Sequence, residues 1–308
     1  MGRVRIMQDF VAHTPWQRLG HQLKLGLRSR AEADWLPHDD LFGNASLRAR
    51  QIALKASLSA ERHGDIFAAL PGSAEAGAET YSMVREHLAR YHAATAPAIP
   101  AQPDPHLHPL DAATRAIPED LLLLEPRTTT PEAPPGENPE PQTLWHLCAG
   151  ALAFPAHWVL AEKMGLPLAA IHEPVPHYGE RLERPMDRFF NAMQIGPISA
   201  RMNWSLQAGE TYYAPHREDR TPLRASDVET RLFLRIENQT LRKLPQTGAI
   251  LFTIRTHMVP FGYWRTNPGA VGELIDMFAE MSADSYAYKC IHLYEDALRD
   301  WHTALLAA

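Results

Sequence analysis

The sequence is poor in the residues that mark several large classes of protein. It contains only two cysteines among 308 residues, Cys148 and Cys290, which is too few for a disulfide framework, a zinc knuckle or the ligands of an iron–sulfur cluster. The formal net charge is -6 and the isoelectric point is about 6.2, so no basic excess is available to neutralise phosphate groups. We therefore expect no nucleic-acid partner.

Long apolar runs and leader-like segments are also missing. Runs such as Leu121 to Leu124 fall far short of the roughly 20 apolar residues that a membrane-spanning helix needs. The first ten residues, MGRVRIMQDF, contain no apolar stretch before a small-residue cleavage site, so they do not predict a signal peptide. We expect a cytoplasmic protein with no membrane partner.

The common loop motifs for nucleotide cofactors do not occur. The sequence has no GxGxxG after a predicted strand, no phosphate-binding loop, and no HExxH, GxSxG or CxxC. We therefore expect neither a flavin nor an iron–sulfur cluster in this chain. Electrons for any redox reaction would have to come from another protein.

The first 142 residues predict a helical region interrupted by proline-rich loops. Apolar side chains recur at helical spacing in residues 46–60 and 74–91. Residues 96–109 and 125–142 are rich in proline and predict exposed loops without regular structure. Between these loops, IPEDLLLL is a short apolar element.

From residue 143 onward the sequence predicts the core of the protein. A short helix is expected from Pro155 to Met164, because proline suits a first helical turn and Gly165 suits a helix end. A second helix is expected to begin at Pro185 and to place Met186, Phe189, Phe190 and Met193 on one face. Residues 268–281 and 284–305 predict two amphipathic helices at the end of the chain.

Three segments between these helices alternate polar and apolar residues with period two, which predicts β-strands. They are residues 198–206, 231–239 and 249–257, and each has a row that contains an arginine. Their connections suit antiparallel pairing. The predicted fold is α+β, with a central antiparallel sheet, packed helices, a helical N-terminal region and C-terminal helices.

Several motifs follow one another in a fixed order between residues 145 and 257. They are WHLCAGALAFPAHWVLAEKMGLPLAAIHEPVPHY, MDRFF, ARMNW and RIENQTLRKLPQTGAILFTIRTH. In this order the motifs resemble those of the haem-dependent oxidative N-demethylase family, and the chain is similar to its haem-binding alpha-type subunit over most of its length. The upstream IPEDLLLLEPR fits the same pattern.

The resemblance implies a fold, a cofactor and a reaction. Residues 143–308 would form a PAS-like catalytic core, integrated with the N-terminal region 1–142 into one unit. This core would bind haem b and use O2 to hydroxylate an N-methyl group of a small methylated amine such as dimethylamine. The product would collapse to formaldehyde and the demethylated amine. The implied partners are a flavin/iron–sulfur reductase and a folate-linked subunit. The alternative is a haem- or ligand-binding PAS-like sensor or a non-catalytic subunit.

A haem iron needs a neutral imidazole whose other ring nitrogen is held by a hydrogen-bond acceptor. His172 is the first candidate, because it follows an apolar run and precedes the rigid sequence EPVP. The competing interpretation is a buried histidine bonded to backbone. His146 and His257 are the alternative ligands.

Haem propionates need cationic partners, and arginine can bind a carboxylate through two parallel hydrogen bonds. The arginine candidates are Arg188, Arg201, Arg235 and Arg255. The candidates to line the haem pocket are Trp204, Phe189 and Phe190. The competing interpretations are a solvated sheet face for the arginines and core packing for the aromatic residues.

A methylated amine is a cation, so its site should offer a carboxylate or an aromatic face. Glu237 is the candidate carboxylate, because it shares a predicted row with Arg235. Its competing role is to pair with a neighbouring arginine. Asn203 is a candidate to donate a hydrogen bond to the substrate or to O2.

Overall fold

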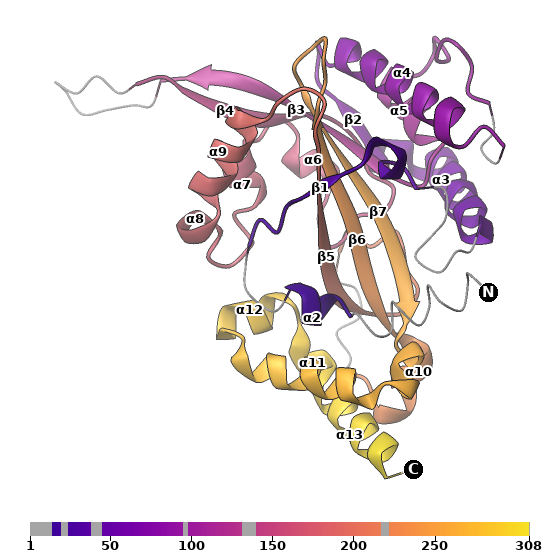
Figure 1. Cartoon of the computed structure of the whole chain (residues 1–308), viewed down its shortest axis with the longest axis vertical. Helices are drawn as coiled ribbons and strands as arrows, with labels where there is room; N and C mark the ends of the chain where they lie inside the picture. Colours follow the sequence, from indigo (N-terminus) through magenta and orange to yellow (C-terminus); the bar gives the residue numbers. More distant parts are fainter. Residues whose placement is uncertain are drawn as a thin grey trace.

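A computed structural model describes residues 14–19, 24–37, 45–94, 98–130, 140–216 and 222–307. In these ranges seven strands form one antiparallel sheet in the order β1-β5-β6-β7-β3-β4-β2 (Figure 1). The strands are β1 (Arg28–Arg30), β2 (Phe67–Ala69), β3 (Asp120–Thr129), β4 (Gln142–Ala151), β5 (Ile198–Ala208), β6 (Leu232–Lys243) and β7 (Ile250–Pro260).

Helices lie on both sides of the sheet and at one end of it (Figure 1). One side holds α4 (Ala74–Tyr91) and α5 (Pro109–Thr114), which pack on Leu121, Leu123 and Leu251, whereas α3 (Ala45–Ile66) packs through Leu58 against Phe233 on the other side. The other side holds α7 (Leu168–Ile171), α8 (Tyr178–Arg181) and α9 (Glu183–Ala192), and a short α6 (Leu160–Lys163) precedes them in the chain. At the end lie α2 (Pro15–Leu19), α10 (Val228–Arg231), α11 (Pro268–Glu280), α12 (Ala283–Tyr288) and α13 (Glu295–Leu306).

The strand register divides the side chains of β5, β6 and β7 between two faces, because residues directly opposite in an antiparallel pair share a face. Asn203 lies opposite Glu237, and Glu237 lies opposite Thr256. We call this the polar face; its charged and amide side chains are Arg201, Asn203, Gln207, Arg235, Glu237, Gln239 and, at the end of β6, Lys243. The opposite, apolar face packs against α11, α13 and Trp16 through Trp204, Leu206, Leu234, Ile236 and Val259.

An apolar cluster packs against each end of the polar face. At one end Leu241 joins a cluster with Leu124 and Trp145 of the sheet, together with Leu168, Met186 and Phe190 from α7 and α9. At the other end Phe233 joins a cluster with Leu58, Phe154, Tyr212 and Met258. The three residues of β6 between these clusters are Arg235, Glu237 and Gln239, so the packing encloses a polar centre.

The main predictions of regular structure are confirmed. The three predicted strands form neighbours β5, β6 and β7. The helix predicted over residues 74–91 has these bounds, and the one predicted over residues 46–60 extends to Ala45–Ile66. The α+β class with an antiparallel sheet is also confirmed.

Three local predictions are wrong. Residues 125–142 were expected to lack regular structure, but β3 continues to Thr129 and β4 begins at Gln142; the β-branched threonines suit a strand, and residues 131–139 lie outside the described ranges. The helix expected from Pro155 begins only at Leu160, because His157 has φ +62° and its backbone N–H donates to Ala214 O. The last predicted helix is broken at Cys290, whose φ is +51°.

Strands from both predicted parts of the chain share the sheet. β3, from residues 1–142, lies between β7 and β4, which come from residues 143–308. The division at residue 142 stays a prediction. No helix within the described ranges is both long and apolar enough to cross a bilayer.

A buried ion pair joins α3 to the start of β3. Lys55 Nζ lies 3.0 Å from Asp120 Oδ1, and the two side chains are 4% and 0% exposed. Lys55 also donates to Thr114 Oγ1 and to Glu119 O. The Asp120 carboxylate accepts from the backbone N–H groups of Ala153 and Phe154 at 3.0 and 2.8 Å. The buried charges of this pair are therefore compensated by groups from α3, α5, the start of β3 and the chain that follows β4.

We expect Lys55→Met to lower the free energy of unfolding by about 3–5 kcal/mol, because it leaves the Asp120 carboxylate buried without its cation. Urea denaturation followed by circular dichroism would measure this change. The control is Arg50→Gln on the same helix: Arg50 is 68% exposed and lies 3.7 Å from Glu210, so its loss should cost under about 1 kcal/mol. Equal effects of the two substitutions would contradict the assignment.

Candidate functional site

The centre of the polar face is a buried carboxylate surrounded by donors. Glu237 Oε2 accepts from Gln239 Nε2 at 3.0 Å and from Asn203 Nδ2 at 3.5 Å. Glu237 Oε1 lies 3.5 Å from Arg235 Nε. Glu237 is 8% exposed, whereas Asn203 is exposed. Glu237 therefore provides one buried negative charge next to the exposed Asn203. A cationic ligand that binds beside Asn203 would contact this carboxylate.

Arg235 contacts this carboxylate and is itself fixed by backbone carbonyl groups. Its Nη2 donates to Phe154 O at 2.7 Å and its Nη1 donates to Tyr212 O at 3.3 Å. Because the backbone N–H of Phe154 donates to Asp120, the chain of contacts continues to Lys55. Arg235 is thus a structural partner of Glu237 with two of its donors already used.

Arg201 extends the polar face toward α8. Burial lowers the pKa of Arg201, and the negative charge of Glu237 and the hydroxyl of Tyr178 oppose that shift. Its Nε is buried and has no hydrogen-bond partner within the described residues. A buried guanidinium N–H without an acceptor is costly, so this position favours an anionic ligand.

His172 lies at the C-terminal end of α7, and its orientation is fixed on both sides of the ring. Nδ1 lies 2.8 Å from Leu168 O, so this nitrogen carries the proton and Nε2 keeps its lone pair. The ring stacks on Tyr178, with centroids 4.7 Å apart and 8° between the planes. Burial lowers the pKa of His172, the bond to Leu168 opposes this, and the charges of Arg201 and Lys163 lower it further. The imidazole is therefore neutral at pH 7.

Tyr178 is a site residue that the sequence analysis missed. Its ring supports His172, and its buried hydroxyl has no hydrogen-bond partner within the described residues. Burial raises its pKa, and the charges of Asp187 and Glu183 add to the increase. The hydroxyl is therefore a neutral donor. Gln239 was also missed, although it continues the period-two row of Arg235 and Glu237.

The structure brings together five of the predicted site residues and separates the others. The five that belong to the polar face and its cover are His172, Arg201, Asn203, Arg235 and Glu237. Arg255 does not share this face, because it lies opposite Asn238 and so on the other face. Its guanidinium lies 3.8 Å from Glu119.

Trp204 and His257 also lie away from the polar face. Trp204 packs against Trp16 in the apolar cluster, at a centroid distance of 6.1 Å. His257 lies opposite Ile236, is fully buried, and has Nε2 at 3.4 Å from Asn238 Nδ2. Arg188 is exposed on α9. Period two fixes which residues of one strand share a face, but only the register between strands fixes how faces combine.

His146 remains a geometrically possible alternative to His172. Its Nδ1 lies 2.9 Å from Gly165 O, and its Nε2 is buried without a hydrogen-bond partner within the described residues. It lies on β4 opposite Glu125, and no polar-face arginine or glutamate contacts it among the described interactions. His172 differs by having Arg201 and Tyr178 beside it.

A family model described as haem-dependent oxidative N-demethylase, alpha subunit-like, matches residues 26–299. The match includes all seven strands of the sheet and every residue of the polar face. It therefore spans the fold and the candidate site together.

We expect His172 to titrate below its ordinary pKa of about 6.5, because it is buried and close to a guanidinium. Removing that positive charge in Arg201→Met should raise the titration midpoint. Two-dimensional NMR of the histidine rings, with His172 assigned from a His172→Gln variant, would follow both proteins. Arg188→Gln, which removes an exposed charge from α9, is the control. A midpoint unchanged in Arg201→Met would show that the two side chains are not neighbours.

Proposed function

The chain belongs to the haem-dependent oxidative N-demethylase, alpha subunit-like family, and we propose that it binds haem on the polar face and oxidatively demethylates a small methylated amine. The observation that carries this proposal is the grouping around one face of a fixed neutral imidazole, a half-buried guanidinium whose Nε has no hydrogen-bond partner among the described residues, and a buried carboxylate. The antiparallel sheet with helices on that face also supports a PAS-like core.

The residues of the polar face fit the requirements of haem. His172 offers Nε2 as an iron ligand, and its Nδ1 is held by the Leu168 carbonyl in the manner of other metal-binding histidines. Arg201 Nε and the Tyr178 hydroxyl are buried donors without a partner in the described ranges, and the carboxylates of a haem group would satisfy them. Arg235 is a weaker candidate for this role, because two of its donors bind backbone carbonyl groups.

Glu237 and Asn203 are the proposed substrate residues. A methylated ammonium group is a cation, and Glu237 is a carboxylate already oriented by Arg235 and Gln239. The exposed Asn203 beside it would face the entrance and orient the amine nitrogen. Because Glu237 is nearly buried, its attraction for a cation is screened less than that of a surface carboxylate.

Haem in this site would supply the activation of O2 and the oxidation of the N-methyl group, with formaldehyde and the demethylated amine as products. We propose that electrons come from a flavin/iron–sulfur reductase and that a folate-linked subunit receives the formaldehyde. The alpha-subunit description of the family supports the existence of other subunits.

The visible absorption spectrum tests the ligand. Protein produced with a haem precursor should show a Soret band, and His172→Ala should lose or shift it, because iron loses its imidazole ligand. His146→Ala is the matched control and should leave the band unchanged. A band that changes only in His146→Ala would move the ligand to β4, and a colourless wild-type protein would contradict haem binding.

The substrate role of Glu237 is tested by Glu237→Gln in haem-loaded protein with a supplied reductant. Loss of the carboxylate should lower kcat/KM for dimethylamine roughly ten- to a hundredfold, because a hydrogen bond to a charged group contributes about 1.5–3 kcal/mol. The Soret band should be retained. Asp300→Asn, an exposed acid on α13, is the control. Unchanged kcat/KM in Glu237→Gln would reassign Glu237 to pairing with arginine.

A further inference from the structure

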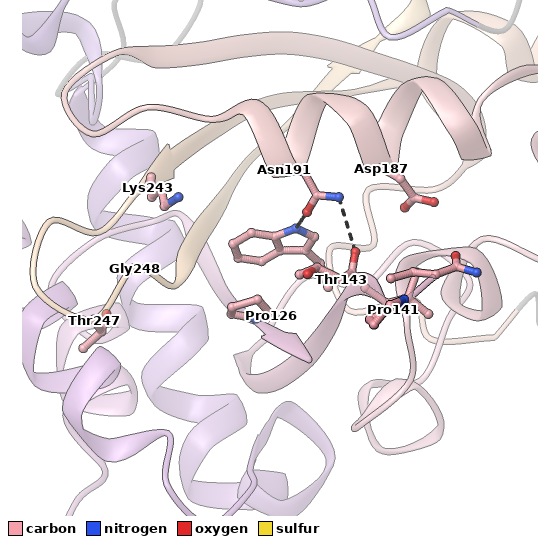
Figure 2. Close-up of a pocket in the computed structure, with 11 residues that line it drawn as sticks. Pro126, Pro141, Thr143, Asp187, Asn191, Lys243, Thr247 and Gly248 are labelled. Carbon is pink, nitrogen blue, oxygen red and sulfur yellow. Dashed lines mark hydrogen bonds between the residues drawn. The ribbon is translucent and has the colours of Figure 1, made fainter. Parts of the chain in front are cut away.

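A second pocket lies away from His172 and Glu237, between the start of β4, α9 and the β6–β7 turn (Figure 2). It has a volume of roughly 690 Å³, which is within the range of about 300–1,000 Å³ that is usual for small-molecule sites. Its walls include Thr143 and Trp145 of β4, Asp187 and Asn191 of α9, and Lys243 of β6.

The walls of this pocket are joined to one another by hydrogen bonds and by a β-bridge. The indole N–H of Trp145 donates to Asn191 Oδ1 at 2.8 Å, and Asn191 Nδ2 donates to Thr143 O at 3.3 Å. A β-bridge between Ile195 and Lys243 joins the chain after α9 to the end of β6.

The β6–β7 turn at the rim is fixed as well. The Glu79 carboxylate accepts from the backbone N–H groups of Gln246 and Thr247, at 2.7 and 2.9 Å, and from the Thr247 hydroxyl at 2.8 Å. Gly248 follows with φ +73°, which glycine adopts without strain. The position of Lys243 just before this turn is therefore well defined.

Two opposite charges line the pocket without partners of their own. Within the described ranges, neither Asp187 nor Lys243 has a side-chain hydrogen bond or an ion pair. Figure 2 shows them on opposite sides of Asn191, to which the indole of Trp145 is bonded. Burial raises the pKa of Asp187, and the charge of Glu183 adds to this. A cation next to Asp187 would therefore relieve an unfavourable environment.

We propose that this pocket binds a small zwitterion, with its ammonium group at Asp187, its carboxylate at Lys243 and the chain between them along Trp145. Each unpaired charge alone would attract a simple ion, but only a molecule with both charges satisfies both residues at once. The indole of Trp145 forms part of the pocket wall, and an aromatic ring attracts an ammonium group. This site requires no haem and does not depend on the proposed demethylation.

Isothermal titration calorimetry of the full chain tests the proposal with three probes of similar length. 4-Aminobutyrate carries both charges, butylamine carries only the positive charge, and butyrate carries only the negative charge. We expect 4-aminobutyrate to bind at least about tenfold more tightly than either of the others. Glycine and 6-aminohexanoate extend the series and report the separation of the two charges that fits best.

The variants should produce a crossed pattern. Asp187→Asn should weaken 4-aminobutyrate and butylamine about tenfold and leave butyrate unchanged, whereas Lys243→Gln should weaken 4-aminobutyrate and butyrate and leave butylamine unchanged. The controls are Arg184→Gln, exposed on α9 outside the pocket, and Asp300→Asn. The proposal is overturned if no zwitterion of the series binds, or if both pocket variants weaken all probes equally.

Discussion

The register between β5, β6 and β7 is the constraint on which the candidate site depends. Asn203, Glu237 and Thr256 lie opposite one another in three adjacent strands, and this alignment puts Arg201, Arg235 and Glu237 on one face. A shift of one residue in β6 would move Glu237 to the apolar face, beside Trp204, and would bring Ile236 among the arginines. The apolar clusters at both ends of the polar face oppose such a shift, because Phe233 and Leu241 fit them only in the observed register.

Burying so much charge requires that every charged group have a defined partner. The contacts run from Lys55 to Asp120, through the backbone of Phe154 to Arg235, and on to Glu237. Such a network contributes little net stability, because desolvation offsets most of the attraction. Its effect is to define orientation: Glu237 has one favoured position because Arg235 has one. Arg201 Nε and the Tyr178 hydroxyl have no hydrogen-bond partner within the part of the chain that the structure describes, and they lie where the cofactor is proposed to bind.

The sequence predicted the elements of this fold better than it predicted the site. Period-two alternation identified β5, β6 and β7, and helical periodicity identified α4 with its bounds. β4 was not predicted as a strand, because its run LWHLCAGA is apolar on both faces and a continuous apolar run does not distinguish strand from helix. The helix expected at Pro155 failed for a tertiary reason, since residues 155–157 pair with Ala214.

The sequence predicts which site residues share a face within one strand, but it does not predict how the strands pair. Arg235 and Glu237 are two residues apart in β6, so their common face follows from the sequence. The separation of Arg255 from them does not, because it depends on the pairing of β6 with β7. Tyr178 was missed because its role comes from stacking on a residue in another helix, and no local pattern encodes that contact. Motif resemblance and physical periodicity thus predicted different things, namely the family and the strands, and neither predicted the arrangement of faces.

The two halves of the polar face are supported from opposite ends. Glu237 is oriented through Arg235 from the α3 end, where the Lys55–Asp120 pair fixes the backbone of Phe154. His172 is oriented from the other end, where Leu168 both accepts its Nδ1 proton and packs in the cluster of Trp145 and Phe190. That cluster also contributes Trp145 to the wall of the second pocket. Because protein interiors are close-packed, a change in the packing of Trp145 would be transmitted to Leu168, which belongs to the same cluster and holds His172 Nδ1. The second pocket is therefore physically joined to the proposed iron ligand.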